Sequence, residues 1–252
     1  MNVIGERINI TTADGTAEAY LARPEGHGRR PGVLLYMDAI GLRPQIEQMA
    51  ERIAGWGFVV LAPNVFYRSA SAAEIAPKVD LRLPGAREAF FPTVTPLIEA
   101  HTPDQAAADF ESYLGLLTES HYVDDRPIGI TGYCMGGRLA LRAAAQKPAA
   151  IAAIGMFHTG GLVTDDADSP HTLIPSITAE VLAGYADQDP SMTAEQITTV
   201  GRLLDHHGVT HASTTYVSAP HGYTMADTSM YHPPAAEWHF RELRQLLVRT
   251  LH

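Results

Sequence analysis

The sequence predicts an α/β fold, in which a mostly parallel central sheet is covered by helices on both faces and preceded by an N-terminal β-hairpin. Short apolar runs alternate with segments of helical periodicity along nearly the whole chain. A strong turn signal, Asp14-Gly15, separates two strand-like runs at the start. With 252 residues, 46% of them hydrophobic, the chain can bury a large core. We therefore expect residues 1–252 to form a single domain.

The first half of the chain supplies the hairpin and the first strands of the sheet. The runs GVLLY and FVVLAP are continuously apolar, as expected of strands that are covered on both faces. A helix opens at Thr102-Pro103, where Gln105 completes a capping box. Residues 63–101 are rich in proline and small residues, and we expect them to be the least regular part of the chain. The expected strands are 6–12, 16–24, 32–36 and 58–63, and the expected helices are 44–57 and a segment from 102 onward.

The second half alternates strands and helices, which implies parallel strands with right-handed crossovers. Ligands of such sheets bind at the carboxyl ends of the strands, so the loops that follow the strands are the place to look for a site. The expected strands are 127–131, 150–157, 179–187 and 212–217, and the expected helices are 136–146, 191–208 and 234–251.

Composition and charge exclude several classes of protein. The formal net charge is −10, and Arg29-Arg30 is the one basic cluster, which argues against a nucleic-acid partner. A single cysteine cannot form an internal disulfide. No apolar run approaches 18 residues, and the N-terminus lacks the apolar core of a signal peptide. We expect a cytoplasmic protein without a membrane partner, either a monomer or a small homo-oligomer.

The single cysteine, Cys134, lies in a pattern typical of a catalytic nucleophile. Gly132 and Gly136 flank it at two residues' distance, after a predicted strand and at the start of a predicted helix. Such a turn exposes the nucleophile, and the glycines remove Cβ atoms that would clash. The helix N-terminus favours the reactive thiolate. A buried structural cysteine is the alternative, but the flanking glycines and the strand-to-helix context favour the nucleophile.

A nucleophile of this kind needs a histidine and an orienting carboxylate on loops that follow later strands. Asp187 and Asp189 follow one predicted strand, and His221 follows the next. The chain order is therefore nucleophile, acid, histidine. The structural alternative for Asp187 is that Asp189-Pro190 initiates a turn and Asp187 caps it. We predict Cys134, Asp187 and His221 as the catalytic residues.

At these residues the sequence resembles the dienelactone hydrolase family of α/β-hydrolases, and the resemblance covers nearly the whole chain. The resemblance implies an α/β-hydrolase fold, Cys134 as nucleophile, His221 as base and Asp187 as its partner. It also implies an oxyanion hole formed by the amides of Met135 and Ala39. The matching segments are the Asp-Gly hairpin, PGVLLYMDAIGL, GFVVLAPNVFYR, GYCMGG, GYADQDP and HGYTM.

Two positions depart from the family pattern. The family has a glutamate in the first loop that helps to activate the thiol, and this chain has Asp38 there. Family members that act on dienelactone carry an arginine four residues after the histidine, and this chain has Met225. A cation for the substrate carboxylate would then come from another arginine; the candidates in the irregular segment are Arg68, Arg82 and Arg87.

Two further residues are candidates for substrate binding or activation. Tyr133 precedes the nucleophile, and His158 follows a predicted strand on the side where the site should lie. A structural role in the loop is the alternative for His158.

We expect neither a metal nor another cofactor. His206 and His207 close a helix and His211 follows it, but no cysteine or carboxylate completes a ligand set with them at useful spacing.

Three hypotheses about function remain open. The leading one is a hydrolase of small esters or lactones that acts through an acyl-cysteine, in the carboxymethylenebutenolidase class. The second is a regulatory protein on the same fold with Cys134 as a redox sensor. The third is a C–C hydrolase or acyltransferase that uses the same triad, because fold and triad do not fix the acceptor.

Overall fold

A computed structural model describes residues 1–187 and 189–252. The chain groups into two compact units. The N-terminal unit comprises Met1–Arg126 with Asp227–Ser229, and the C-terminal unit comprises Pro127–Ala226 with Met230–His252. The single-domain organisation of residues 1–252 stays a prediction.

The N-terminal unit contains four strands in the order β1-β2-β4-β3. The hairpin predicted at Asp14-Gly15 is confirmed, because β1 and β2 pair as antiparallel strands with Thr12 opposite Gly15. β4 pairs antiparallel with β2 and parallel with β3. Every residue of β3 and β4 is buried, as their unbroken apolar sequences predict. The strands are β1 (Val3–Thr12), β2 (Gly15–Pro24), β3 (Gly32–Tyr36) and β4 (Val59–Pro63).

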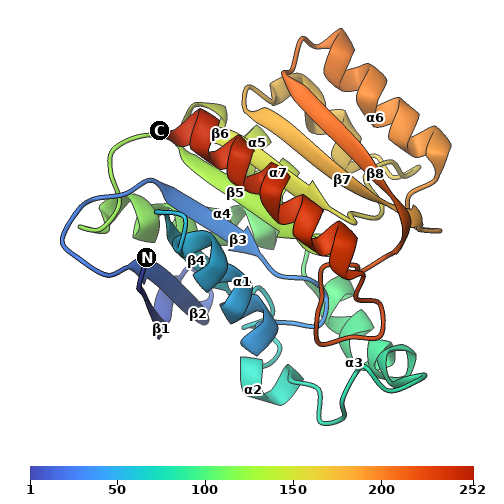
Figure 1. Ribbon diagram of the computed structural model, residues 1–252, viewed down its shortest axis with the longest axis horizontal. Coiled ribbons are helices and arrows are strands. Elements are labelled where there is room, and N and C mark those ends of the chain that lie inside the picture. The colour runs from blue at the N-terminus through green and yellow to red at the C-terminus, as the bar shows by residue number, and fades with distance from the viewer. The chain divides into compact units, whose positions relative to one another are not determined.

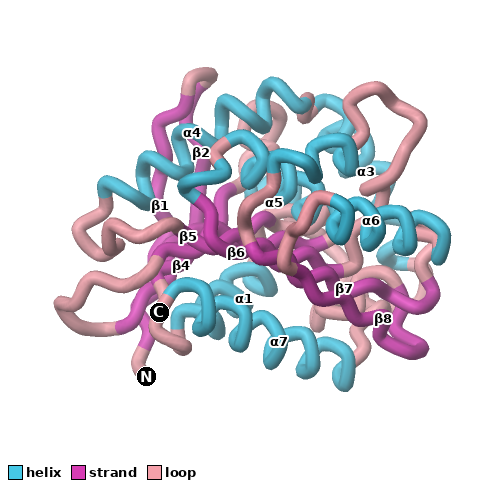
Figure 2. Tube along the Cα trace, turned by 90° about the horizontal axis from the view of Figure 1, so that it is seen from above, coloured by secondary structure: helices cyan, strands magenta, loops and turns pink.

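Two long helices cover the two faces of these strands (Figure 2). α1 (Pro44–Ala54) packs on β2 and β4, and α4 (Pro103–Glu119) packs on β1 and β3. The predicted capping box at the start of α4 is present, because Thr102 and Gln105 each bond the backbone amide of the other.

The expectation of an irregular segment at 63–101 is wrong in part. Two helices lie there, α2 (Ala72–Ile75) and α3 (Ala86–Ala100). Pro92 and Pro96 lie inside α3, and an interior proline removes a backbone donor, which is why the sequence argues against a helix. Only Val94 of α3 is buried, so the apolar positions that would reveal a helix by their periodicity are missing as well.

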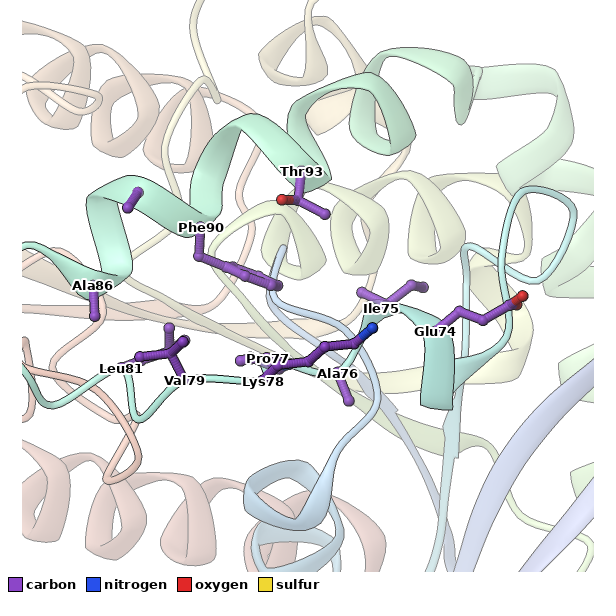
Figure 3. Close-up of a pocket in the computed structure, with 11 residues that line it drawn as sticks. Glu74, Ile75, Ala76, Pro77, Lys78, Val79, Leu81, Ala86, Phe90 and Thr93 are labelled. Carbon is purple, nitrogen blue, oxygen red and sulfur yellow. The ribbon is translucent and has the colours of Figure 1, made fainter.

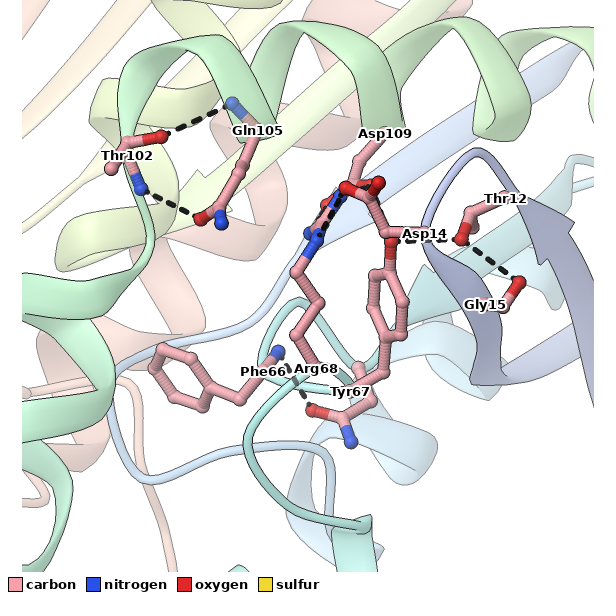
Figure 4. A network of polar contacts seen from close by, with 10 residues as sticks. Thr12, Asp14, Gly15, Phe66, Tyr67, Arg68, Thr102, Gln105 and Asp109 are labelled. Carbon is pink, nitrogen blue, oxygen red and sulfur yellow. Dashed lines mark hydrogen bonds and ion pairs between the residues drawn. The ribbon is translucent and has the colours of Figure 1, made fainter.

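A buried carboxylate ties the β1–β2 turn to α4 (Figure 4). Asp109, whose side chain is 1% exposed, accepts hydrogen bonds from the guanidinium of Arg68 at 2.7 Å and from the hydroxyl of Tyr67 at 2.8 Å. The same guanidinium bonds Asp14 in the turn at 2.7 Å. Because a buried charge is stable only when it is paired, Arg68 is a structural residue of this unit.

Replacing Arg68 by methionine is expected to lower the free energy of unfolding by about 3–5 kcal/mol, because it leaves the Asp109 carboxylate buried without its cation. Arg82→Met is the matched control. Arg82 pairs with Asp80 on the surface, where the two side chains are 67% and 42% exposed, and its loss should lower the free energy of unfolding far less than the loss of Arg68. Urea unfolding of both variants measures the difference, and equal losses would contradict this account.

The C-terminal unit contains four parallel strands in the order β5-β6-β7-β8. All six residues of β5 are buried. The strands are β5 (Ile128–Tyr133), β6 (Ile151–Phe157), β7 (Glu180–Gln188) and β8 (His211–Pro220). The parallel pairing brings the carboxyl ends of all four strands to one edge.

Helices cover both faces of these strands as well. α5 (Met135–Gln146) packs on β5 and β6, and α7 (Pro233–Leu251) packs on β6 and β7. In this unit α7 runs along one face, and α5 and α6 (Ala194–His206) lie on the other (Figures 1 and 2). None of the helices built from the described residues has the length and apolar character to cross a bilayer.

Candidate active site

Cys134 is the single residue between β5 and α5, and it lies in a sharp turn. Its φ is 55°, in the left-handed region that residues with a side chain rarely adopt. The chain is held there by a hydrogen bond from its amide to the carbonyl of Phe157 in β6, at 3.0 Å. A Cβ at Gly132 would lie 2.0 Å from the carbonyl oxygen of Gly136, so the first glycine of the motif is required by close approach of the helix. The thiol is partly exposed, as a nucleophile must be.

His221 follows β8 directly and faces the thiol. Its Nε2 lies 3.1 Å from the sulfur of Cys134, within hydrogen-bond distance. The two residues are 87 positions apart in sequence, and the parallel strands bring them together at one edge. The predicted pairing of this histidine with this cysteine is present in the structure.

The carboxylate that holds His221 is Asp189, and the prediction of Asp187 as its partner is wrong. His221 Nδ1 lies 2.6 Å from an oxygen of Asp189, whose side chain is 1% exposed. Asp187 is exposed and accepts a hydrogen bond from the amide of Ser218 in β8, at 2.9 Å. The β7–β8 register shifts just after Ala186, so the two carboxylates do not follow a regular strand alternation.

Ser191 completes the carboxylate's environment, and the sequence analysis missed it. Its amide and its hydroxyl donate to the second oxygen of Asp189, at 2.9 and 2.5 Å. Its hydroxyl also lies 3.4 Å from His221 Nδ1. Asp189-Pro190 with a serine two residues after the aspartate is the sequence of an Asx turn, which is the signal that could have found it.

These contacts set the charges of the site. Burial alone lowers the pKa of His221, but the negative Cys134 sulfur and the Asp189 carboxylate outweigh it and raise the pKa to about 10. Burial raises the pKa of Asp189, yet its hydrogen bonds with His221 and Ser191 hold that pKa below its usual range. At neutral pH the geometry therefore favours a thiolate beside an imidazolium that is held by an ionised carboxylate.

Iodoacetamide is expected to alkylate Cys134 at about pH 6 at least tenfold faster than it alkylates free cysteine, which is under about 1% thiolate there. Because the pKa of His221 is raised to about 10, the imidazolium that pairs with the thiolate persists up to about that pH, and the rate should change little between about pH 6 and pH 9. Mass spectrometry of the single cysteine measures the rate. A profile that climbs with pH like that of free cysteine would show a neutral resting thiol.

Three other predicted residues of this unit lie beneath the surface. Tyr133, His158 and Met225 are each at most 1% exposed. Tyr133 packs on Phe157, and its hydroxyl lies 3.3 Å from Nε2 of His239 in α7. A role of Tyr133 and Met225 in substrate binding stays a prediction.

In the N-terminal unit, Asp38 is held by an arginine that the sequence analysis missed. Both oxygens of Asp38 accept from the buried guanidinium of Arg43, at 2.6 and 3.2 Å, and one of them also accepts from the amide of Ile40. The same guanidinium pairs with Asp227 at 2.6 Å. These bonds fix the loop that carries Ala39. The activating role of Asp38 and the oxyanion role of Ala39 stay predictions.

The three candidate arginines of this unit differ in how firmly they are held. Arg68 is bound by two carboxylates, and Arg82 is bound by both oxygens of Asp80. Arg87, in the first turn of α3, has Glu88 at 3.8 Å and the ring of Phe91 beneath its guanidinium as its partners among the described residues. Of the three guanidinium groups, that of Arg87 would give up the weakest ion pair on binding another anion.

A pocket of about 390 Å³ lies between the end of α2 and the first turns of α3 (Figure 3). Its walls are mainly apolar, with Ile75 and Leu81 on one side and Phe90 on the other, and Lys78 supplies a cation. Of the described residues, eleven line it, and none of them is a predicted site residue.

No grouping of three histidine, cysteine, aspartate or glutamate residues that could hold a metal occurs within residues 1–187 and 189–252. The expectation of a reaction without a metal stays a prediction.

A nucleophile-type turn after one strand, with a carboxylate and a histidine on loops after later strands, defines the α/β-hydrolase class. Comparison with known proteins agrees. Residues 17–251 match the sequence profile described as "Dienelactone hydrolase family". The chain therefore belongs to the dienelactone hydrolase family.

Known relatives are distant in sequence. A Yersinia pestis protein described as "Putative carboxymethylenebutenolidase" is 26% identical over 87% of this chain and 78% of its own length. A Bradyrhizobium protein described as "Probable 2-oxo-3-(5-oxofuran-2-ylidene)propanoate lactonase" is 25% identical over 91% of this chain and 88% of its own.

The fold is similar to that of solved members of the family. The crystal structure of a dienelactone hydrolase homologue from Klebsiella pneumoniae superimposes with a TM-score of 0.84, at 22% identity, over 99% of this chain and 100% of that one. The predicted α/β-hydrolase fold is confirmed.

Proposed function

We propose that the protein hydrolyses small carboxylic esters or lactones through an acyl-cysteine intermediate. The observation that carries the proposal is the chain of contacts from the Cys134 sulfur through His221 to Asp189. Membership of the dienelactone hydrolase family and the lactone-hydrolase names of two relatives support it.

In the acylation step the Cys134 thiolate attacks the carbonyl carbon of the ester. A C–S bond forms, and the carbonyl electron pair moves onto oxygen to give a tetrahedral oxyanion. The oxyanion collapses, the C–O bond of the leaving group breaks, and the imidazolium of His221 gives its Nε2 proton to the departing alkoxide. With a lactone the alkoxide stays attached to the acyl group.

In the deacylation step a water molecule attacks the thioester carbon while neutral His221 takes one of its protons. The second tetrahedral oxyanion expels the Cys134 thiolate, and the carboxylic acid leaves. Asp189 stays ionised throughout, holding the imidazole in place and stabilising its charge.

The amides of Met135 and Ala39 are the proposed oxyanion donors. Met135 opens α5, where the first amides of a helix have no acceptor within the helix, so its N–H suits a developing negative charge. Ala39 is proposed from the family resemblance and sits in the loop fixed by Arg43.

We propose small uncharged acyl groups as the preferred substrates. Met225 stands where dienelactone-cleaving relatives carry an arginine, and Arg68 and Arg82 are bound to carboxylates of this chain. Arg87 is the remaining candidate for an anionic substrate. An Arg87→Gln variant assayed on a carboxylated lactone tests that role.

A panel of p-nitrophenyl esters and small lactones, neutral and carboxylated, tests the proposal. Because the chain has one cysteine, the protein alkylated with iodoacetamide is a control that differs only at Cys134. Turnover of at least one ester or lactone, lost on alkylation, is the expected result. No turnover across the panel, or turnover that survives alkylation, would reject the function.

A further inference from the structure

His158 lies directly against the predicted catalytic histidine. It follows β6, is 0% exposed, and has a φ of 38°. Its ring packs edge-on to the ring of His221, with centroids 5.2 Å apart, and edge-on to that of Tyr223, with centroids 5.0 Å apart. A left-handed backbone at a residue with a large side chain is uncommon and persists only where its surroundings impose it.

Two hydrogen bonds fix this residue, one to β7 and one to the loop that carries His221. The amide of His158 donates to the carbonyl of Gly184 in β7, at 2.8 Å. Its Nε2 lies 2.7 Å from the hydroxyl of Thr224, three residues after His221. The side chain therefore joins the end of β6 to the loop after β8, with the His221 ring packed against it.

The loop that carries His158 also contacts Ser191, the residue that holds the Asp189 carboxylate. A Cβ at Gly160 would lie 2.1 Å from the hydroxyl oxygen of Ser191, and the amide of Gly161 donates to the Ser191 carbonyl at 3.0 Å. Ser191 in turn donates to Asp189. Residues 158–161 therefore support both the His221 imidazole and the Asp189 carboxylate.

We propose that His158 is a positioning residue that holds the His221 imidazole against Cys134 through ring packing and the bond to Thr224. The inference rests on the proposed function, in which His221 serves the thiolate. A sulfur and an imidazole act as an ion pair only while they stay within hydrogen-bond distance. Movement of the His221 ring away from Cys134 therefore destabilises the thiolate. Among the described residues, Tyr133, His221 and Tyr223 are the ionisable groups whose rings face His158.

The experiment measures the pH profile of Cys134 alkylation, which needs no substrate. His158→Phe keeps a ring but loses the bond to Thr224, and Thr224→Val removes the hydroxyl without touching the Cys134–His221–Asp189 contacts. Each variant is expected to slow labelling at about pH 6 at least about threefold and to make the rate climb between about pH 6 and pH 9, where that of the unmodified protein changes little. The double variant should be no worse than His158→Phe alone, because both changes break the same bond.

His239→Phe is the matched control, since His239 is equally buried and belongs to the same ring cluster but bonds Tyr133 rather than the His221 loop. Its labelling profile should match that of the unmodified protein. His158→Asn, which tolerates a positive φ and can donate to Thr224, should recover part of the rate.

Where an ester is turned over, kcat should fall about tenfold in His158→Phe and Thr224→Val with KM within about threefold. Profiles of His158→Phe and Thr224→Val that coincide with the unmodified protein would overturn the proposal, and so would an equal shift in His239→Phe. Because alkylation is read without substrate, a panel that shows no hydrolysis rejects the function while the positioning role is still tested.

Discussion

Asp189→Asn is expected to lower kcat about 10³- to 10⁴-fold, whereas Asp187→Asn should leave it within about threefold. The Asp189 carboxylate lies 2.6 Å from His221 Nδ1 and accepts a hydrogen bond from its N–H, which leaves Nε2 to serve the sulfur. An asparagine there can present its NH₂ group to Nδ1 and so favour the wrong tautomer. Asp187 is exposed, and asparagine can still accept from the Ser218 amide.

The measurement is kcat and KM for the best substrate of the panel, with the alkylation profile of Cys134 beside it. Each variant changes one carboxylate to an amide, and the two positions are only two residues apart, so each variant is a control for the other. A larger loss in Asp187→Asn than in Asp189→Asn would mean that the observed contact is not the one that works in catalysis.

Most of the fold can be predicted from the sequence, because a strand that is buried within the sheet appears locally as a short apolar run. The runs in β3 and β4 are apolar throughout, all of β3, β4 and β5 is buried, and the hairpin and the α4 capping box are coded by a few residues each. α3 lacks such a pattern. It buries a single residue and contains two prolines, so nothing local separates it from a loop.

The candidate site divides in the same way. The positions of Cys134 and His221 follow from motif and chain order, since both stand where a strand ends. The choice between Asp187 and Asp189 depends on a register shift in the pairing of β7 with β8, which a single sequence does not encode locally. Arg43 and His158 each have a partner distant in sequence, Asp227 and Thr224, and these contacts have no local signature.

Cys134→Ala is expected to reduce ester or lactone turnover by at least about 10⁴-fold. The activity that remains is what substrate binding and the oxyanion donors provide alone. Cys134→Ser is the sharper variant, since it exchanges one atom. A serine hydroxyl is neutral at working pH, so the negative charge that helps to raise the pKa of His221 to about 10 is lost. The reaction must then begin with proton removal by His221 rather than from a standing ion pair. We expect a loss of at least about 10³-fold in kcat.

Both variants are assayed on the substrate that the unmodified protein turns over best, with the free energy of unfolding measured to show that the fold is intact. The alternative of a redox sensor predicts no ester or lactone turnover by the unmodified protein or by either variant, because a sensor needs an oxidisable thiol and no acyl transfer. Full hydrolysis by Cys134→Ala would show that the sulfur is not the nucleophile. A thioester on the unmodified protein, trapped by acid quench during turnover and absent from Cys134→Ser, would instead establish the acyl-cysteine directly, because the serine variant can only form an oxygen ester.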